Sequence, residues 1–96
     1  MTAIKATLED LRNEINALDT QLVTLLVKRM HVALSIADLK ENSVDAVTAK
    51  NRVEAVLGRV SQLAANNNGD EAFIRKIYEL IISELTEMQL KKKGLF

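Results

Sequence analysis

The sequence predicts an all-α fold, and two observations carry this prediction. Proline is absent, and glycine occurs only three times in 96 residues, which is too few for a β protein rich in turns. Apolar residues also recur at helical spacing over three stretches, about residues 6–41, 48–65 and 70–92. We therefore expect one domain of three helices that covers residues 1–96.

The first stretch is expected to form one very long amphipathic helix. At about 100° per residue, nine apolar side chains fall within about 60° of a common line. These are Leu8, Leu11, Ile15, Leu18, Leu22, Leu25, Leu26, Ala33 and Ile36. A helix of about 35 residues is roughly 50 Å long, whereas a compact domain of this size is about 30 Å across. A second copy of the chain is thus expected to cover the helix in an intertwined homodimer.

Cations interrupt this apolar stripe. Arg29 lies about 20° from its centre, Lys40 almost on it and Arg12 near its border. An unpaired buried charge costs several kcal/mol, so these positions indicate either an anionic ligand or acidic partners at the helix edges. The side-chain roots of Arg29 and Lys40 would lie about 16 Å apart, which leaves room for a small molecule. Because arginine binds carboxylates in a bidentate way, a ligand with more than one carboxylate fits best.

The second stretch follows a connection at about residues 41–48, and Asp45 or Thr48 is expected to cap its helix. Its predicted apolar face includes a further cation, and consists of Ala49, Arg52, Val53, Val56, Val60 and Leu63. Asparagines and Gly69 predict a turn before the third helix, which Asp70 is expected to cap.

The third helix carries an apolar stripe that includes Leu85. Gln89 lies on the border of this stripe, four residues after Leu85, where a neutral amide can reach inward. The lysines at residues 91–93 are interpreted as a solvated tail that suits the negative end of the helix dipole.

Composition excludes several classes of function. Thirteen basic residues balance thirteen acidic ones, which argues against a nucleic-acid partner. There is no cysteine and only one histidine, so we expect no disulfide and no metal site. No apolar run approaches the 18 or more residues of a membrane span, and the N-terminus does not resemble a signal peptide. The protein is thus expected to be cytoplasmic, without a membrane partner.

The predicted pocket has cations but lacks groups for covalent or acid–base chemistry. The stripes offer no cysteine, no serine beside a base and no carboxylate on an inward face. Catalysis would therefore depend on orientation and electrostatic stabilisation, which suit the unimolecular rearrangement or elimination of a polyanion.

The chain resembles the all-helical chorismate mutases over nearly all of its length. The residues that carry the resemblance are Leu11-Arg12, Ile15-x-x-Leu18-Asp19, Leu25-Leu26-x-x-Arg29, Lys40, Arg52 and Gln89, in this order. The resemblance implies an intertwined helical dimer that converts chorismate to prephenate without a cofactor. It implies that Arg12 of a partner chain joins Arg29 and Arg52 around the substrate carboxylates. It also implies that Lys40 and Gln89 donate hydrogen bonds to the breaking ether oxygen.

Three positions depart from the pattern of the family. Val53 stands where these mutases usually have a glutamate that binds the ring hydroxyl, Leu85 replaces a serine, and Ala49 replaces a frequent aspartate. Loss of one such charged hydrogen bond typically costs about 1.5–3 kcal/mol.

These departures leave alternatives to the mutase open. An arginine followed by a valine, as at Arg52 and Val53, resembles the sequence of the isochorismate-pyruvate lyases, which share the fold. An amino analogue of chorismate is a further possible substrate. A non-enzymatic alternative is a helical dimerisation or regulatory module. A pure packing module, however, would gain stability by replacing buried cations with apolar residues.

Overall fold

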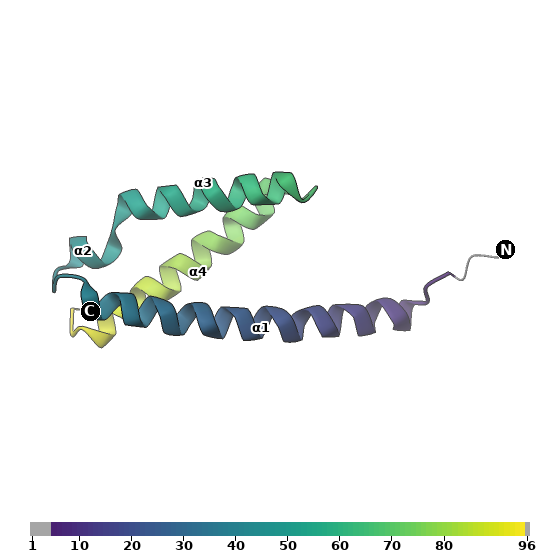
Figure 1. Cartoon of the computed structure of the whole chain (residues 1–96), viewed down its shortest axis with the longest axis horizontal. Coiled ribbons are helices and arrows are strands. Elements are labelled where there is room, and N and C mark those ends of the chain that lie inside the picture. Colours follow the sequence, from purple (N-terminus) through teal and green to yellow (C-terminus); the bar gives the residue numbers. More distant parts are fainter. Residues whose placement is uncertain (1–4, 96) are drawn as a thin grey trace. The chain divides into compact units, whose positions relative to one another are not determined.

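The structure is a computed structural model that describes residues 5–95, and every regular element in this range is a helix. These are α1 (Leu8–Leu39), α2 (Val44–Thr48), α3 (Lys50–Asn66) and α4 (Glu71–Lys92), as labelled in Figure 1. The prediction of an all-α fold is confirmed. The connection after α1 differs from the prediction, because it contains the short helix α2. None of the helices in the described range is long and apolar enough to span a membrane.

The contacts divide the chain into two compact units, one that ends at His31 and one that begins at Val32. The first unit contains most of α1. Its helix begins with a reciprocal cap, in which the backbone N–H of Asp10 donates to the hydroxyl of Thr7 over 3.1 Å. The N–H of Thr7 in turn donates to Oδ2 of Asp10 over 3.0 Å, so the helix starts two residues later than expected. These hydrogen bonds hold the pKa of Asp10 below its ordinary value.

The large apolar side chains on the stripe of α1 are exposed. Only Ala37 of this helix is buried. The exposed residues of the stripe are Leu8, Leu11, Ile15, Leu18, Leu22, Leu25, Leu26 and Ile36. The exposure leaves a long apolar surface on α1 available to a partner.

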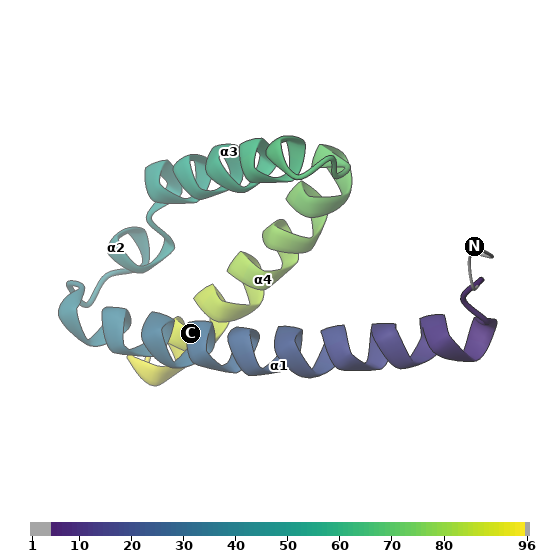
Figure 2. The same cartoon turned by 45° about the vertical axis from the view of Figure 1, so that its right-hand side comes forward.

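The second unit holds the core of the chain. Helices α3 and α4 pack against one another, and α2 packs against α4; Figure 2 shows the short turn that joins α3 to α4. The buried residues of α3 are Val56, Leu57, Val60 and Ala64. The buried face is therefore rotated by about 45° from the predicted one. Arg52 and Leu63 of the predicted face are exposed in the single chain, and Leu57 and Ala64 are buried in their place.

The junction of α2 and α3 is also different from the prediction. Ser43 caps α2 by accepting a hydrogen bond from the N–H of Ala46 over 3.1 Å. Asp45 or Thr48 was expected to cap the helix that corresponds to α3, but the N-cap residue of α3 is Ala49, which makes no side-chain cap hydrogen bond. The Thr48 hydroxyl donates backward to the carbonyl of Val44 over 2.9 Å. Ala49 then separates the two helices in a left-handed conformation with φ of 43°, which usually costs an alanine roughly 1–2 kcal/mol.

The turn between α3 and α4 has the predicted form. Asn68 adopts a left-handed φ of 56°, and the N–H of Gly69 donates to the carbonyl of Ala64 over 2.7 Å. Asp70 caps α4 by accepting a hydrogen bond from the N–H of Phe73 over 3.0 Å. Both predictions for this turn are confirmed.

Candidate active site

The residues predicted to bind a ligand fall into both units of the chain. Arg12 and Arg29 lie on the part of α1 that belongs to the first unit, where Arg12 is exposed and Arg29 is half-buried. Lys40, Arg52 and Gln89 belong to the second unit. The residues of each unit are therefore described on their own below.

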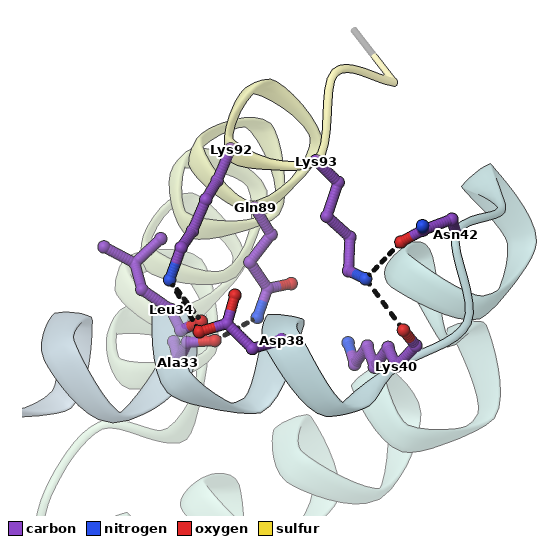
Figure 3. Close-up of polar contacts among 8 residues, drawn as sticks. All are labelled: Ala33, Leu34, Asp38, Lys40, Asn42, Gln89, Lys92 and Lys93. Atoms are coloured by element: carbon purple, nitrogen blue, oxygen red, sulfur yellow. Dashed lines mark hydrogen bonds and ion pairs between the residues drawn. The ribbon is translucent and has the colours of Figure 1, made fainter.

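Gln89 is the buried polar residue of α4. Its side chain is 6% exposed, and no other polar residue within residues 5–95 is buried to this degree. Its amide Nε2 donates a 2.6 Å hydrogen bond to the carbonyl of Ala33, near the end of α1 (Figure 3). The prediction that this amide reaches inward is confirmed. A side-chain amide carries two N–H donors, so this hydrogen bond leaves the second donor for another acceptor.

Lys40 directly follows α1 and is half-buried. Its ammonium Nζ donates a 2.9 Å hydrogen bond to the carbonyl of Val47 in α2. Partial burial lowers the pKa of Lys40 below its ordinary value of 10.5, and the positive charge of Lys93 lowers it further. An anion bound here would stabilise the charged form that this environment disfavours.

Gln89, Lys40 and Lys93 form a polar cluster at the end of α1, and the neighbouring Lys92 contacts α1 without touching Gln89 or Lys40. Lys92 donates to Oδ2 of Asp38 over 2.9 Å and to the carbonyl of Leu34 over 3.2 Å. Lys93 donates to the carbonyl of Lys40 over 2.7 Å and to Oδ1 of Asn42 over 2.6 Å. Figure 3 shows both side chains reaching from α4 to the end of α1 and the turn that follows it.

The interpretation of these lysines as a solvated tail was therefore wrong for Lys93, which is half-buried, whereas Lys92 is exposed and pairs with Asp38. The last turn of α1 contains no basic residue. The lysines of α4 therefore supply the positive charge that stabilises the negative end of the α1 dipole. The spacing of Lys93 could have identified it as a neighbour of Gln89. Lys93 follows Gln89 by four residues, so the two side chains share one face of α4.

The remaining predicted residues are not part of this cluster. Arg52 is exposed on α3, while Ala49 and Val53 are half-buried. Leu85 is half-buried on α4, one turn before Gln89. Val53 lines an open groove of about 520 Å³ between α3 and α4. The other lining residues are Thr48, Lys50, Glu54, Ser83, Thr86, Glu87 and Leu90. On α4, this groove lies about 130° around the helix from Leu85 and Gln89.

The cluster at the end of α1 thus offers hydrogen-bond donors and positive charge. Lys40 and Lys93 offer ammonium donors, and Gln89 offers a neutral amide. Among residues 5–95, no group of three or more histidine, cysteine, aspartate or glutamate side chains is placed to hold a metal ion. Such a cluster suits the binding of anionic or ether oxygens.

Within residues 5–95 the chain is all-helical, and a very long first helix leads into the cluster of donors, so the fold defines a class of helical proteins. The comparison with known families identifies the class. The sequence model described as chorismate mutase type II matches residues 11–90, a range that includes both Arg12 and Gln89. The chain therefore belongs to the chorismate mutase type II family.

Three relatives are similar over most of this chain. A bifunctional chorismate mutase/prephenate dehydratase of Buchnera aphidicola subsp. Schizaphis graminum is 33% identical over 84 residues, which cover 85% of this chain and 22% of the relative. One of the same name from Enterobacter agglomerans is 31% identical over 87 residues, 88% of this chain and 22% of the relative. A 4-amino-4-deoxychorismate mutase of Streptomyces venezuelae is 30% identical over 82 residues, which cover 85% of this chain and 80% of the relative.

The relatives thus differ in how much of them the chain spans. It covers about a fifth of each bifunctional relative but most of the relative that is named for the amino analogue. All three are named as mutases, and none is named as a lyase.

Proposed function

We propose that the chain is a chorismate mutase that rearranges chorismate to prephenate without a cofactor. The observation that carries this proposal is the family match, because it spans all the candidate site residues from Arg12 to Gln89. Arg12, Arg29 and Arg52 bind the two carboxylates of the substrate through charge-assisted hydrogen bonds. Lys40 and Gln89 donate to the ether oxygen, where negative charge develops as the bond breaks.

The proposed reaction needs no nucleophile and no proton transfer. It is unimolecular, so the protein lowers the barrier by holding the flexible substrate in a reactive conformer and by placing donors at the developing charge. The contacts of Gln89 and Lys40 support this role. Each side chain has one hydrogen bond to a backbone carbonyl, at Ala33 and Val47 respectively, and keeps at least one further N–H donor for a ligand.

The active form in this proposal is a homodimer in which Arg12 enters the site of the partner chain. The exposed apolar stripe of α1 supports it, because a contiguous apolar surface of this length usually marks a protein interface. A second copy of the chain would cover both stripes by two-fold symmetry. The long helix would then bring the Arg12 of one chain to the Arg29 and Lys40 of the other.

A second candidate substrate is 4-amino-4-deoxychorismate. The observation that favours it is the match to the Streptomyces venezuelae relative, which the chain covers over 80% of its length. The rearrangement and the roles of the cations are the same for both substrates.

The test is to incubate the purified protein separately with chorismate, 4-amino-4-deoxychorismate and isochorismate, and to identify the products by chromatography. Arg29→Ala serves as the control for background turnover. Enzyme-like prephenate formation from chorismate, abolished in Arg29→Ala, is the expected result. Faster rearrangement of the amino compound would assign the second candidate substrate.

Two results would contradict the mutase. Salicylate and pyruvate from isochorismate, without rearrangement of the other two compounds, would assign a lyase. Absence of any product from a folded helical protein would favour a dimerisation or regulatory module.

A further inference from the structure

Lys93 connects the end of α4 to Lys40, the residue that we propose donates a hydrogen bond to the ether oxygen of the substrate. Its ammonium lies 2.7 Å from the backbone carbonyl of Lys40 and 2.6 Å from Oδ1 of Asn42. Both acceptors belong to the segment between α1 and α2, where the chain leaves the helix. In Figure 3 the Lys93 side chain spans the space between the last turn of α4 and this segment.

The segment has few backbone hydrogen bonds of its own. The N–H of Lys40 donates to the carbonyl of Ala37 over 3.2 Å, and that of Ser43 donates to the carbonyl of Glu41 over 2.9 Å. The carbonyl at the end of a helix has no partner within the helix, and Lys93 supplies one for Lys40. The direction in which the chain leaves α1 thus depends on a side chain of α4.

Lys40 is consequently held at two points. Lys93 holds its backbone from α4, and Val47 accepts the hydrogen bond of its ammonium from α2. The charged group that faces Lys40 from α4 is Lys93, whereas α2 faces it with the uncharged carbonyl of Val47. Asp38, the nearby carboxylate on α1, pairs with Lys92.

We propose that Lys93 is a positioning residue for Lys40: by holding the carbonyl of Lys40 and the side chain of Asn42, it aims the Lys40 ammonium at the bound substrate. This inference rests on the proposed function, because it uses the role of Lys40 as a donor to the ether oxygen. Misplacement of a catalytic group by about 1 Å can lower the rate by about 100-fold. Loss of Lys93 should therefore affect the reaction more than the binding of substrate.

Lys92 provides a matched control. It is the neighbouring residue, and it also joins α4 to α1 through one backbone carbonyl and one side chain, at Leu34 and Asp38. Neither of these contacts involves Lys40. A general role in holding α4 against α1 would therefore be shared by Lys92 and Lys93, whereas the positioning of Lys40 belongs to Lys93.

The experiment compares Lys93→Met, Lys93→Arg and Lys92→Met with the wild-type protein. Methionine keeps the apolar length of lysine without its donors, and arginine restores charge and donors. We expect Lys93→Met to lower kcat by roughly 10- to 100-fold with KM changed by less than about threefold. Lys93→Arg should recover most of kcat, and Lys92→Met should keep the wild-type kcat. Melting temperatures of all variants show whether a loss of activity follows a loss of stability.

A second measurement does not depend on turnover. The titration of the Lys40 side chain, followed by NMR in protein labelled at lysine, should move to higher pH in Lys93→Met and stay unchanged in Lys92→Met. Removal of a neighbouring positive charge makes protonation of Lys40 easier, which gives the direction of this shift.

The outcomes separate this inference from the proposed function. An active wild-type protein in which both methionine variants have the same kcat would overturn the role of Lys93 and leave the mutase intact. A wild-type protein that acts on none of the three substrates would overturn the proposed function. In that case an unchanged Lys40 titration in Lys93→Met would overturn the positioning role too, and a shifted one would support it for a different anionic ligand.

Discussion

The side chain of Gln89 and the backbone of Ala33 are joined by a 2.6 Å hydrogen bond between positions that are 56 residues apart in the sequence. Gln89 is thereby fixed on α4 with its amide directed at the last turns of α1. Lys40 follows these turns directly, so two of the proposed donors are assembled at one end of one helix. A donor held by a second contact loses less entropy when substrate binds, which favours catalysis by preorganisation.

Replacing Gln89 by leucine tests this donor. Gln89→Leu should lower kcat by about 100- to 1,000-fold, the usual effect of removing one preorganised donor. The free energy of unfolding should change by only about 1 kcal/mol, because the net value of one hydrogen bond is small and leucine suits a buried position. Turnover kinetics and urea unfolding measure both quantities. Gln62→Leu is the control, because that amide bonds Asn66 on the exposed surface of α3; a similar loss of kcat there would contradict the prediction.

The lowered pKa of Lys40 predicts how stability depends on pH. Below the pKa of Lys40 in the fold, both the folded and the unfolded state are protonated, and the fold carries the full cost of the partly buried charge. Between that pKa and the ordinary value of 10.5, the unfolded state binds more protons. The contribution of Lys40 to the free energy of unfolding therefore rises with pH in this range.

Urea unfolding of the wild-type protein and of Lys40→Met, from pH 7 to pH 10.5, measures this contribution as a difference. We expect the free energy of unfolding of the wild type to rise relative to that of Lys40→Met as pH rises. Lys76→Met, a change of an exposed lysine of α4, controls for the loss of one positive charge. A difference between wild type and Lys40→Met that stays constant over the range would contradict the lowered pKa.

The sharing of Arg12 across two chains can be tested by complementation. Arg12→Ala and Arg29→Ala should each abolish turnover and leave the helical content unchanged in circular dichroism. When the two variants are unfolded together and refolded, half of the dimers pair one chain of each kind, and one of their two sites is intact. The mixture should thus regain about a quarter of the wild-type activity. No recovery would mean that Arg12 and Arg29 of the same chain form one site.

The proposed interface predicts different effects for two neighbouring residues of α1. Leu22 and Val23 are similarly exposed in the chain, at 56% and 59%, but only Leu22 lies on the apolar stripe. Leu22→Asp should raise the dimer dissociation constant by more than about 100-fold, because burial of an unpaired carboxylate costs several kcal/mol. Val23→Asp should have a much smaller effect. Sedimentation velocity at several concentrations tests both, and a monomeric wild-type protein would contradict the dimer.

Gly58 offers a substitution that should stabilise the chain. It lies within α3, and a Cβ atom at this position would meet nothing within 4 Å. Gly58→Ala should therefore raise the free energy of unfolding by about 0.5–1 kcal/mol, because alanine favours a helix more than glycine does. Thermal unfolding measures the gain. A loss of stability would show that the exposed side of α3 is in close contact with a partner.

Local signals in the sequence predicted most of the helical framework. The third predicted helix agrees with α4 to within one residue, and Asp70 caps it as expected. Caps and turns depend on residues within about four positions of one another, so their pattern can be recognised without tertiary contacts. The inward direction of Gln89 was also predicted, because its spacing from Leu85 places both on one side of the helix.

The sequence selected the candidate site residues but not their arrangement in space. The pattern of apolar residues selected Arg12, Arg29, Lys40 and Arg52, yet the position of Arg52 on α3 differs from the expected one. The buried face of its helix is turned by about 45° from the predicted one, because Leu57 and Ala64 are buried while Arg52 and Leu63 are exposed. A helical pattern with several small apolar residues allows more than one face to be buried, and the partner helix selects between them.

By itself, therefore, the sequence determined the all-helical class, the cap at Asp70 and the residues that we propose bind an anion. The tertiary structure alone decided the short helix α2, the left-handed Ala49 and the partners of Lys92 and Lys93. Both lysines bind acceptors more than 50 positions away in the chain. Helical periodicity specifies which side chains share a face but not which backbone atoms of another helix that face meets, because packing between helices sets those contacts.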